Sequence, residues 1–219
     1  MHKVIFMRKS EAHAIHGGLS QTTKMPCKSN SLPTEACDTG FEMAKIEGSI
    51  CNKCYANKGN YAKYAGTIKP AQFARLDALR DPYWVDAMVT SIDADPYFRW
   101  HDSGDIQGLW HFENIVAVAK LTPKTLHWLP TREYKIIKAY IDKHGRDAIP
   151  NNLIVRLSAM YIDKPVIIPK SLQGIRGITV SNVHTTKPIG NACNAPAQNG
   201  ECRECRTCWT SAPVSYAYH

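Results

Sequence analysis

The sequence predicts an α/β fold with a mostly parallel sheet and a cysteine-rich segment at each end of the chain. Strand-like and helix-like patterns alternate through the middle of the chain, which is typical of βαβ units. All eight cysteines of the 219 residues lie outside that middle part. We therefore expect one domain over residues 1–219, made of an N-terminal segment (1–66), a β/α core (67–183) and a C-terminal segment (184–219).

The first half of the core is predicted to contain three helices and one strand. Apolar residues recur at helical spacing in "IKPAQFARLDAL" (68–79) and in "DPYWVDAMVTSI" (81–92), where Asp-Pro is a plausible helix start. The aromatic run "YFRWHDSGD" (97–105) predicts a strand that ends in a turn. A third helix is expected over "GLWHFENIVAVAKL" (108–121), because a proline follows its end.

The second half continues the alternation. A strand is expected over "TLHWLPTR" (125–132), and a helix over "EYKIIKAYIDKHG" (133–145), with Gly145 as its stop signal. Two more strands are expected over "NLIVRLSAM" (152–160) and "GITVSNV" (177–183). An α+β fold with an antiparallel sheet remains the alternative.

Polar side chains stand at the ends of all four predicted strands. In a parallel sheet the carboxyl ends of the strands meet at one edge, where ligands bind. We therefore expect a binding site built from these residues, whose members are His101, Asp102, Ser103, Asp105, Thr131, Arg132, Arg156, Ser158, Ser181 and Asn182. The other interpretation is that these residues belong to ordinary polar loops.

Composition and charge narrow the class of protein. Apolar residues make up 44% and charged residues 21%, which is typical of a globular protein. No apolar run reaches the roughly 18 residues of a membrane span, and the N-terminal stretch lacks the features of a signal peptide. We therefore expect a cytoplasmic protein without a membrane partner. The net charge of +8 is compatible with a nucleic-acid partner and equally with solvated lysines on helix faces.

The cysteines form two quartets in sequence order, and each quartet ends in C-x-x-C. The first is Cys27, Cys37, Cys51 and Cys54, and the second is Cys193, Cys202, Cys205 and Cys208. In a reducing compartment, clustered cysteines hold metal more often than they form disulfides. Thiolates select zinc, copper(I) or iron–sulfur clusters. The C-x-x-C-x-x-C run of the tail resembles that of bacterial ferredoxins, which favours an iron–sulfur cluster over zinc.

Six separated blocks of the sequence resemble the phage gene product 88 family. They are "KMPCKSNSLPTEACDTG", "GSICNKCYANKGNY", "FRWHDSGDIQ", "HWLPTREY", "NLIVRLSAM" and "CRECRTCW", in this order from about Lys24 to the end. The resemblance implies a bacteriophage or prophage origin, hence the cytoplasm of an infected host cell, and an iron–sulfur protein. It implies no particular activity.

The sequence also resembles radical S-adenosylmethionine enzymes, through "CNKCY" (51–55) and the turn "HDSGD" (101–105). This resemblance implies a partial or full (β/α) barrel and a 4Fe–4S cluster with one open iron, held by Cys37, Cys51 and Cys54. It implies that Asp102, Ser103, Gly104 and Asp105 hold the cofactor. The polar partners expected beside them are Arg132, Arg156 and Ser158.

Three functions follow as alternatives. The first is a radical-S-adenosylmethionine-like enzyme with one or two 4Fe–4S clusters, acting on a nucleic acid or a nucleotide. The second is a non-catalytic iron–sulfur protein, whose cluster has a structural or electron-transfer role. The third is a zinc-stabilised nucleic-acid-binding module. The sequence leaves open which of them applies, and so whether the protein is an enzyme.

Overall fold

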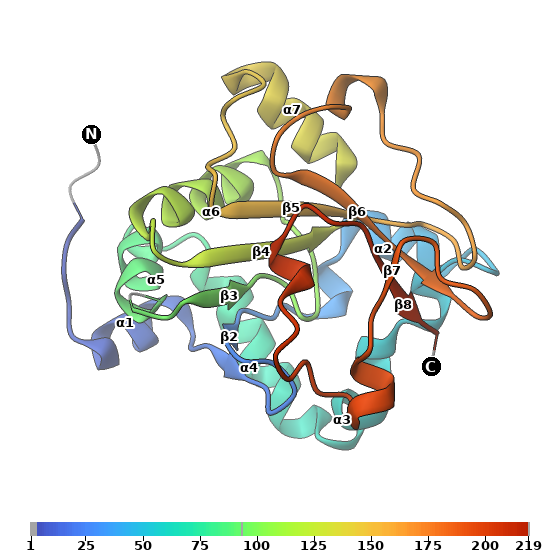
Figure 1. Cartoon of the computed structure of the whole chain (residues 1–219). Coiled ribbons are helices and arrows are strands. Elements are labelled where there is room, and N and C mark those ends of the chain that lie inside the picture. The colour runs from blue at the N-terminus through green and yellow to red at the C-terminus, as the bar shows by residue number, and fades with distance from the viewer. Residues whose placement is uncertain (1–3, 93, 219) are drawn as a thin grey trace.

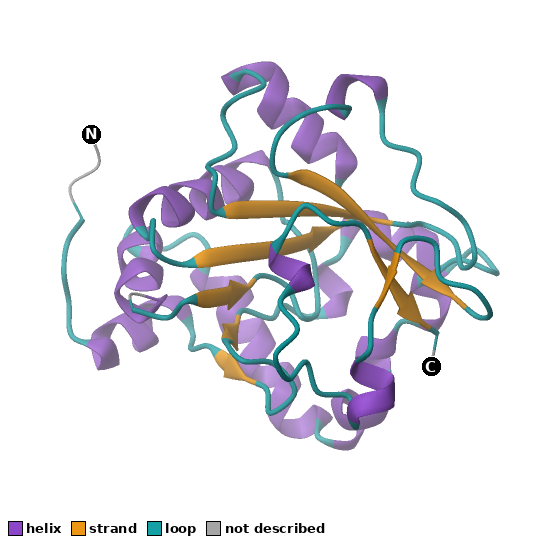
Figure 2. Cartoon of the chain, viewed as in Figure 1, coloured by secondary structure: helices purple, strands orange, loops and turns teal. Residues whose placement is uncertain are grey.

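The computed structural model describes residues 4–92 and 94–218, and its centre is one eight-stranded sheet (Figures 1 and 2). The strand order is β1-β2-β3-β4-β5-β6-β8-β7. The strands are β1 (Ser20–Gln21), β2 (Lys28–Ser29), β3 (Tyr97–Arg99), β4 (Leu126–Thr131), β5 (Leu153–Ser158), β6 (Ile178–His184), β7 (Asn191–Ala192) and β8 (Val214–Ala217). The sheet therefore takes strands from both cysteine-rich segments as well as from the core.

The neighbours in this sheet pair in parallel, apart from β1 and β2, which pair antiparallel. The predicted mostly parallel α/β sheet is thus confirmed, and the antiparallel alternative is wrong. The pairings of the described residues run from β1 at one edge to β7 at the other. They do not show a closed barrel.

The four helices predicted for the core are present, and three more precede them. The helices are α1 (Lys9–His16), α2 (Asp38–Ala44), α3 (Gly59–Lys63), α4 (Ala65–Ala78), α5 (Trp84–Ile92), α6 (Leu109–Leu121) and α7 (Tyr134–His144). Gly145 ends α7 as expected, with φ at 90° and its N–H donated to the carbonyl of Ile141 at 2.8 Å. The connection from β5 to β6 contains only a short 3-10 turn, Lys170–Leu172, in place of a crossover α-helix. No helix among the described residues is long and apolar enough to cross a membrane.

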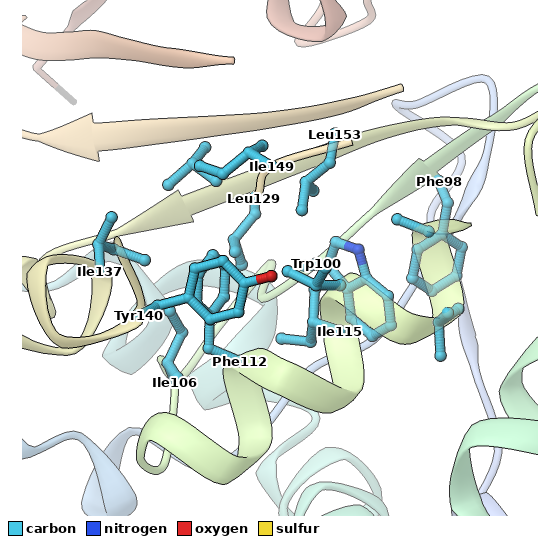
Figure 3. Close-up of a cluster of buried hydrophobic side chains, with 14 of the residues drawn as sticks. Phe98, Trp100, Ile106, Phe112, Ile115, Leu129, Ile137, Tyr140, Ile149 and Leu153 are labelled. Carbon is cyan, nitrogen blue, oxygen red and sulfur yellow. The ribbon is translucent and has the colours of Figure 1, made fainter. Parts of the chain in front are cut away.

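The main hydrophobic core lies between one face of the sheet and helices α5, α6 and α7 (Figure 3). Alternate residues of each strand point into it, because successive side chains of a strand face opposite sides. The strands contribute Phe98, Leu129 and Leu153, and α6 contributes Phe112 and Ile115, all of them fully buried. This packing fixes which residues of β3, β4 and β5 are left for the opposite face.

The opposite face of the sheet carries Arg99, Trp128 and Arg156 from the same three strands. The Arg99 guanidinium lies 4.4 Å from the ring centroid of Trp128, its register partner on β4. The C-terminal segment, red in Figure 1, runs across this face in front of β4. Trp209 of this segment donates its indole N–H to the carbonyl of Phe98 at 3.0 Å. The segment is thereby fixed against the sheet, although between residues 193 and 213 its regular structure is limited to short 3-10 turns.

Candidate functional site

A cavity of about 910 Å³ opens at the carboxyl ends of the parallel strands. Residues that follow β3 and β4 line it, together with the last residues of β5 and residues of β6 and β8. The segment from residue 34 to residue 69 forms another part of the wall. The predicted position of the binding site is therefore occupied by a real cavity, which is large enough for a ligand the size of a nucleotide.

Three cysteines line this cavity: Cys37, Cys51 and Cys54. Cys37 is the residue directly before α2. The Glu133 carboxylate, at the end of β4, accepts hydrogen bonds from the Thr39 N–H at 2.9 Å and from the Thr39 hydroxyl at 2.7 Å. Since these donors lie in the first turn of α2, they fix this helix, and Cys37 with it, against the carboxyl edge of the sheet.

The other two thiols belong to a tight turn. A 3-10 turn over Cys51–Lys53 lets the Cys54 N–H donate to the Cys51 carbonyl at 3.2 Å. The turn is attached to the end of β5, because the Ile50 N–H donates to the Met160 carbonyl at 3.0 Å. Both thiols of the C-x-x-C pair are thereby presented to the same cavity.

Gly40 shows how closely the thiols approach each other. A Cβ on this residue would stand 3.5 Å from the Cys37 sulfur, 3.8 Å from the Cys51 sulfur and only 2.9 Å from the Cys37 Cβ. Both sulfur atoms therefore lie within 4 Å of one point beside Gly40. The Cys37 Cβ leaves no room for an added carbon at that point.

The charges around these thiols are mixed. Burial raises the pKa of the Cys37 thiol, and the negative charges of Asp105, Cys54 and Cys51 raise it further. Burial also raises the pKa of Cys51, while the Arg132 guanidinium acts in the opposite direction. A metal that binds here must displace the protons of these thiols.

The turn after β3 has a mainly structural role. Asp105 accepts hydrogen bonds from the Thr131 hydroxyl (2.6 Å), the Arg132 N–H (2.8 Å) and the Ile106 N–H (2.8 Å). Burial raises the pKa of Asp105 to about 6, and the bonds from Thr131 and Arg132 oppose this shift. Asp105 thus links the ends of β3 and β4 at the cavity wall, with its carboxylate already engaged by the protein.

The remaining predicted residues of this turn differ in position. Ser103 and Gly104 line the cavity, but the Ser103 hydroxyl donates to the Leu32 carbonyl at 2.8 Å. Gly104 has φ at 76°, and a Cβ there would lie 2.5 Å from the Leu32 Cβ, so only glycine fits. Asp102 is buried outside the cavity wall, and its carbonyl accepts bonds from the hydroxyls of Tyr55 and Tyr61. Of the turn, Asp102 is therefore the residue that the structure does not bring to the cavity.

The predicted polar partners, Arg132, Arg156 and Ser158, also differ in whether they line the cavity. Arg132 and Ser158 line the cavity, and Arg132 donates from Nε to the Ala159 carbonyl at 3.0 Å. Arg156 does not line the cavity, and its position corrects the expectation from the sequence. Its side chain points to the face of the sheet that the C-terminal segment covers. It donates there to five carbonyls, those of Val180, Thr207, Cys208, Thr210 and Ala212.

His101 is a cavity-lining residue that the resemblance did not single out. Its side chain is buried, and neither ring nitrogen has a hydrogen-bond partner in the described structure. Its φ of 49° is uncommon for a residue other than glycine, and such strain clusters at functional sites. Burial lowers the pKa of His101 to about 3, so the imidazole is neutral. Its position directly after a strand is the signal by which the sequence identified it as a candidate.

The cysteines do not group in space as they do along the chain. Cys27 is absent from the cavity wall, is only 9% exposed and packs with Trp128, Trp209 and Cys208 on the face under the C-terminal segment. Cys193, Cys202 and Cys205 are also absent from that wall. The structure therefore places three thiols at the cavity and five elsewhere, and Cys27 lies apart from the other three cysteines of its quartet.

Among residues 4–92 and 94–218, no group of three or more His, Cys, Asp or Glu side chains is placed to hold a single metal ion. A tetrahedral zinc needs its thiolates about 2.3 Å from the metal, hence close to one another. In an iron–sulfur cubane each thiolate binds a different iron, and the sulfur ligands stand farther apart. Cys37, Cys51 and Cys54 share one cavity wall, and the described residues do not arrange them as a single-ion site.

Comparison with known proteins gave one match. The model of a family described as Gene product 88 matches residues 6–211. Searches of curated proteins and of solved structures gave no significant match.

Proposed function

The chain belongs to the gene product 88 family, and we propose that it is a phage-encoded iron–sulfur protein with a radical-S-adenosylmethionine-like partial barrel and the corresponding enzymatic chemistry. The observation that carries this proposal is the set of three thiols, Cys37, Cys51 and Cys54, on the wall of the cavity at the strand ends. A 4Fe–4S cluster bound by three thiolates keeps one iron without a protein thiolate.

The position of Cys27 supports three-thiol coordination. It is the remaining cysteine of the N-terminal segment, and it lies outside the cavity, packed against Trp128 and Trp209. The described wall therefore offers these three thiols and no fourth. The iron without a thiolate would face the cavity, where a ligand with amino and carboxylate groups can bind it.

The cavity suits S-adenosylmethionine as that ligand. Its volume of about 910 Å³ is in the range of sites for small ligands and leaves room for part of a substrate. Neutral His101 offers a donor and an acceptor, and Ser158, Ser181 and Asn182 place further polar groups on the same wall. When bound, cluster and cofactor would supply one-electron cleavage of the cofactor's sulfonium C–S bond, with an external reductant as the electron source.

The chain's own residues fix the geometry for this chemistry. Glu133 and Asp105 tie α2 and the turn after β3 to the end of β4. The rigid strand ends hold the polar groups in place, while Tyr55 and Tyr61 cover one side of the cavity. Such preorganisation allows a cofactor and a substrate to be held next to each other with little reordering of the protein.

The substrate class that we propose is a nucleic acid or a nucleotide. The net charge of +8 favours an anionic partner, and Lys53, Arg99 and Arg132 line the cavity. Aromatic residues of the wall, Phe41 and Tyr55, are exposed enough to stack on a base.

The test is anaerobic purification of the full chain, iron and sulfide counting, and electron paramagnetic resonance of the reduced protein with and without S-adenosylmethionine. We expect a 4Fe–4S signal that the cofactor changes, and formation of 5′-deoxyadenosine after reduction. In Cys51→Ser the cofactor-dependent change should be lost. Cys27→Ser is the matched control, because it removes a thiol that lies outside the cavity, and it should retain the change.

Two results would overturn the proposal. A cluster signal that S-adenosylmethionine leaves unchanged would select a non-catalytic iron–sulfur protein. Zinc without iron in the anaerobic preparation would select a zinc-stabilised nucleic-acid-binding module.

A further inference from the structure

The five cysteines away from the cavity lie around the C-terminal segment and close to one another. Cys27 and Cys208 belong to one packed cluster with Trp128 and Trp209. The Cys202 N–H donates to the Lys24 carbonyl at 2.9 Å, which joins the tail to the chain just before Cys27. The segment from residue 193 to residue 213 contains only short 3-10 turns, so it has little regular structure of its own.

The backbone of this segment already presents its thiols in a compact arrangement. The Cys205 N–H donates to the Cys202 carbonyl at 2.9 Å, and the Cys193 N–H donates to the Ser215 carbonyl at 2.8 Å. The Cys208 sulfur lies 3.4 Å from the hydroxyl of Tyr216, the residue after Ser215. Residues of β8 thus contact the segment from residue 193 to residue 208 at both of its ends. This brings Cys193 to the side of the segment that carries Cys208.

The register of the edge strands agrees with this arrangement. Ala192 of β7 pairs with Ser215 of β8, so Cys193 stands beside Tyr216, whose hydroxyl contacts the Cys208 sulfur. Strand β8 thereby brings Cys193 to the loop that carries the C-x-x-C-x-x-C run.

Positive side chains surround the group. Arg99 and Arg206 both act on Cys27 and Cys202, and Arg206 lies 5.2 Å from the ring centroid of Tyr97 on the same face. Buried Arg156 donates to the carbonyls of Thr207 and Cys208. A centre bound by four thiolates carries net negative charge, and these three guanidinium groups would balance it.

We propose that Cys193, Cys202, Cys205 and Cys208 hold a second iron–sulfur cluster, fully ligated by thiolates, which fastens the C-terminal segment to the open face of the sheet. It has no open iron, so it binds neither cofactor nor substrate. The C-x-x-C-x-x-C run, which resembles that of bacterial ferredoxins, favours a cubane over zinc. The inference does not rest on the proposed function, since it uses none of the cavity cysteines.

The test compares metal content and protease resistance of the anaerobically reconstituted full chain. Cys205→Ser, at the most exposed of the four thiols, should contain about four iron atoms fewer than the intact protein, which is half of the total when the cavity cluster is also present. Cys205→Ser should also become sensitive to trypsin at exposed Arg203, which the loaded protein protects. Cys27→Ser is the matched control, and it should keep the full iron content and the protection.

Three outcomes would overturn the inference: unchanged iron in Cys205→Ser, halved iron in Cys27→Ser, or one zinc per chain lost on Cys205→Ser with the iron unchanged. The cavity site is assessed separately. In Cys205→Ser, S-adenosylmethionine should still change the remaining paramagnetic signal. If this response is lost in Cys51→Ser and kept in Cys205→Ser, the loss bears on the proposed function and not on the C-terminal cluster.

Discussion

At the scale of single residues, Gly40 and Gly104 limit what the site can accommodate. Gly104 needs its positive φ and has Leu32 against it, so its role is conformational. Gly40 lies inside α2, where alanine would normally be the better helix former. A Cβ at this position would stand 2.9 Å from the Cys37 Cβ. A residue that disfavours the helix is therefore required by the position of Cys37.

Gly40→Ala is expected to lower the iron content of the cavity site, because the added Cβ would lie 2.9 Å from the Cys37 Cβ and displace that thiol. The matched control is Gly66→Ala in α4, where nothing lies within 4 Å of the added atom. The control should raise the free energy of unfolding by about 0.5–1 kcal/mol and keep its iron. Iron counting and urea unfolding measure both effects. Full iron in Gly40→Ala would mean that the thiols are not used together.

At the scale of elements, Arg156 shows how one side chain of a strand fixes a segment without regular structure. It lies on the face of β5 opposite Leu153, Val155 and Leu157, which point into the main core. A buried guanidinium without an acidic partner is costly, and here five carbonyls accept hydrogen bonds from its two terminal nitrogens. The same bonds satisfy carbonyls of the 207–212 segment, which has no strand to pair with.

Arg156→Met is expected to lower the free energy of unfolding by about 2–4 kcal/mol, because it leaves buried carbonyls without donors. Arg146→Met is the control, since exposed Arg146 likewise donates to two carbonyls, those of Ser171 and Gln173. Its loss should cost at most about 0.5 kcal/mol. Urea unfolding compares the two variants. Equal losses of unfolding free energy in the two variants would show that the hydrogen bonds of Arg156 do not hold the C-terminal segment against the sheet.

At the scale of the whole molecule, the pH dependence of stability reflects histidines that are buried in neutral form. Burial lowers the pKa of His127 to about 3, and burial together with the His13 charge lowers that of His16 to about 4. In the unfolded chain both groups titrate near 6.5. Below about pH 6.5 the unfolded chain therefore binds more protons than the folded protein. Stability is fully present above that pH and is lost as the pH falls.

We expect the free energy of unfolding of the protein to fall between pH 7 and pH 5, by up to about 1.4 kcal/mol per pH unit for each such histidine. His16→Asn and His127→Asn should each reduce the slope of the unfolding free energy against pH by the contribution of one histidine. Anaerobic urea titrations at several pH values measure it. Slopes that are identical in the variants and in the parent would contradict this prediction.

The sequence by itself determined the elements of the core and the position of the site. Helices such as 108–121 and strands such as 125–132 repeat their apolar residues with a local period, and Gly145 marks a helix end by its own backbone preference. Polar residues at strand ends such as Ser158 could be assigned to one edge, because parallel strands share it. The two-residue strands β1, β2 and β7 were not predictable, since two residues show no alternation.

Only the tertiary structure decided which residues meet across long stretches of chain. It placed Cys27 beside the tail cysteines and left three thiols at the cavity. It turned Arg156 toward carbonyls and Asp102 away from the cavity wall. The physical reason is that periodicity and turn preferences act over a few residues. Contacts between distant segments depend on which sheet face the core leaves free, and here the packing of α5, α6 and α7 determined that face.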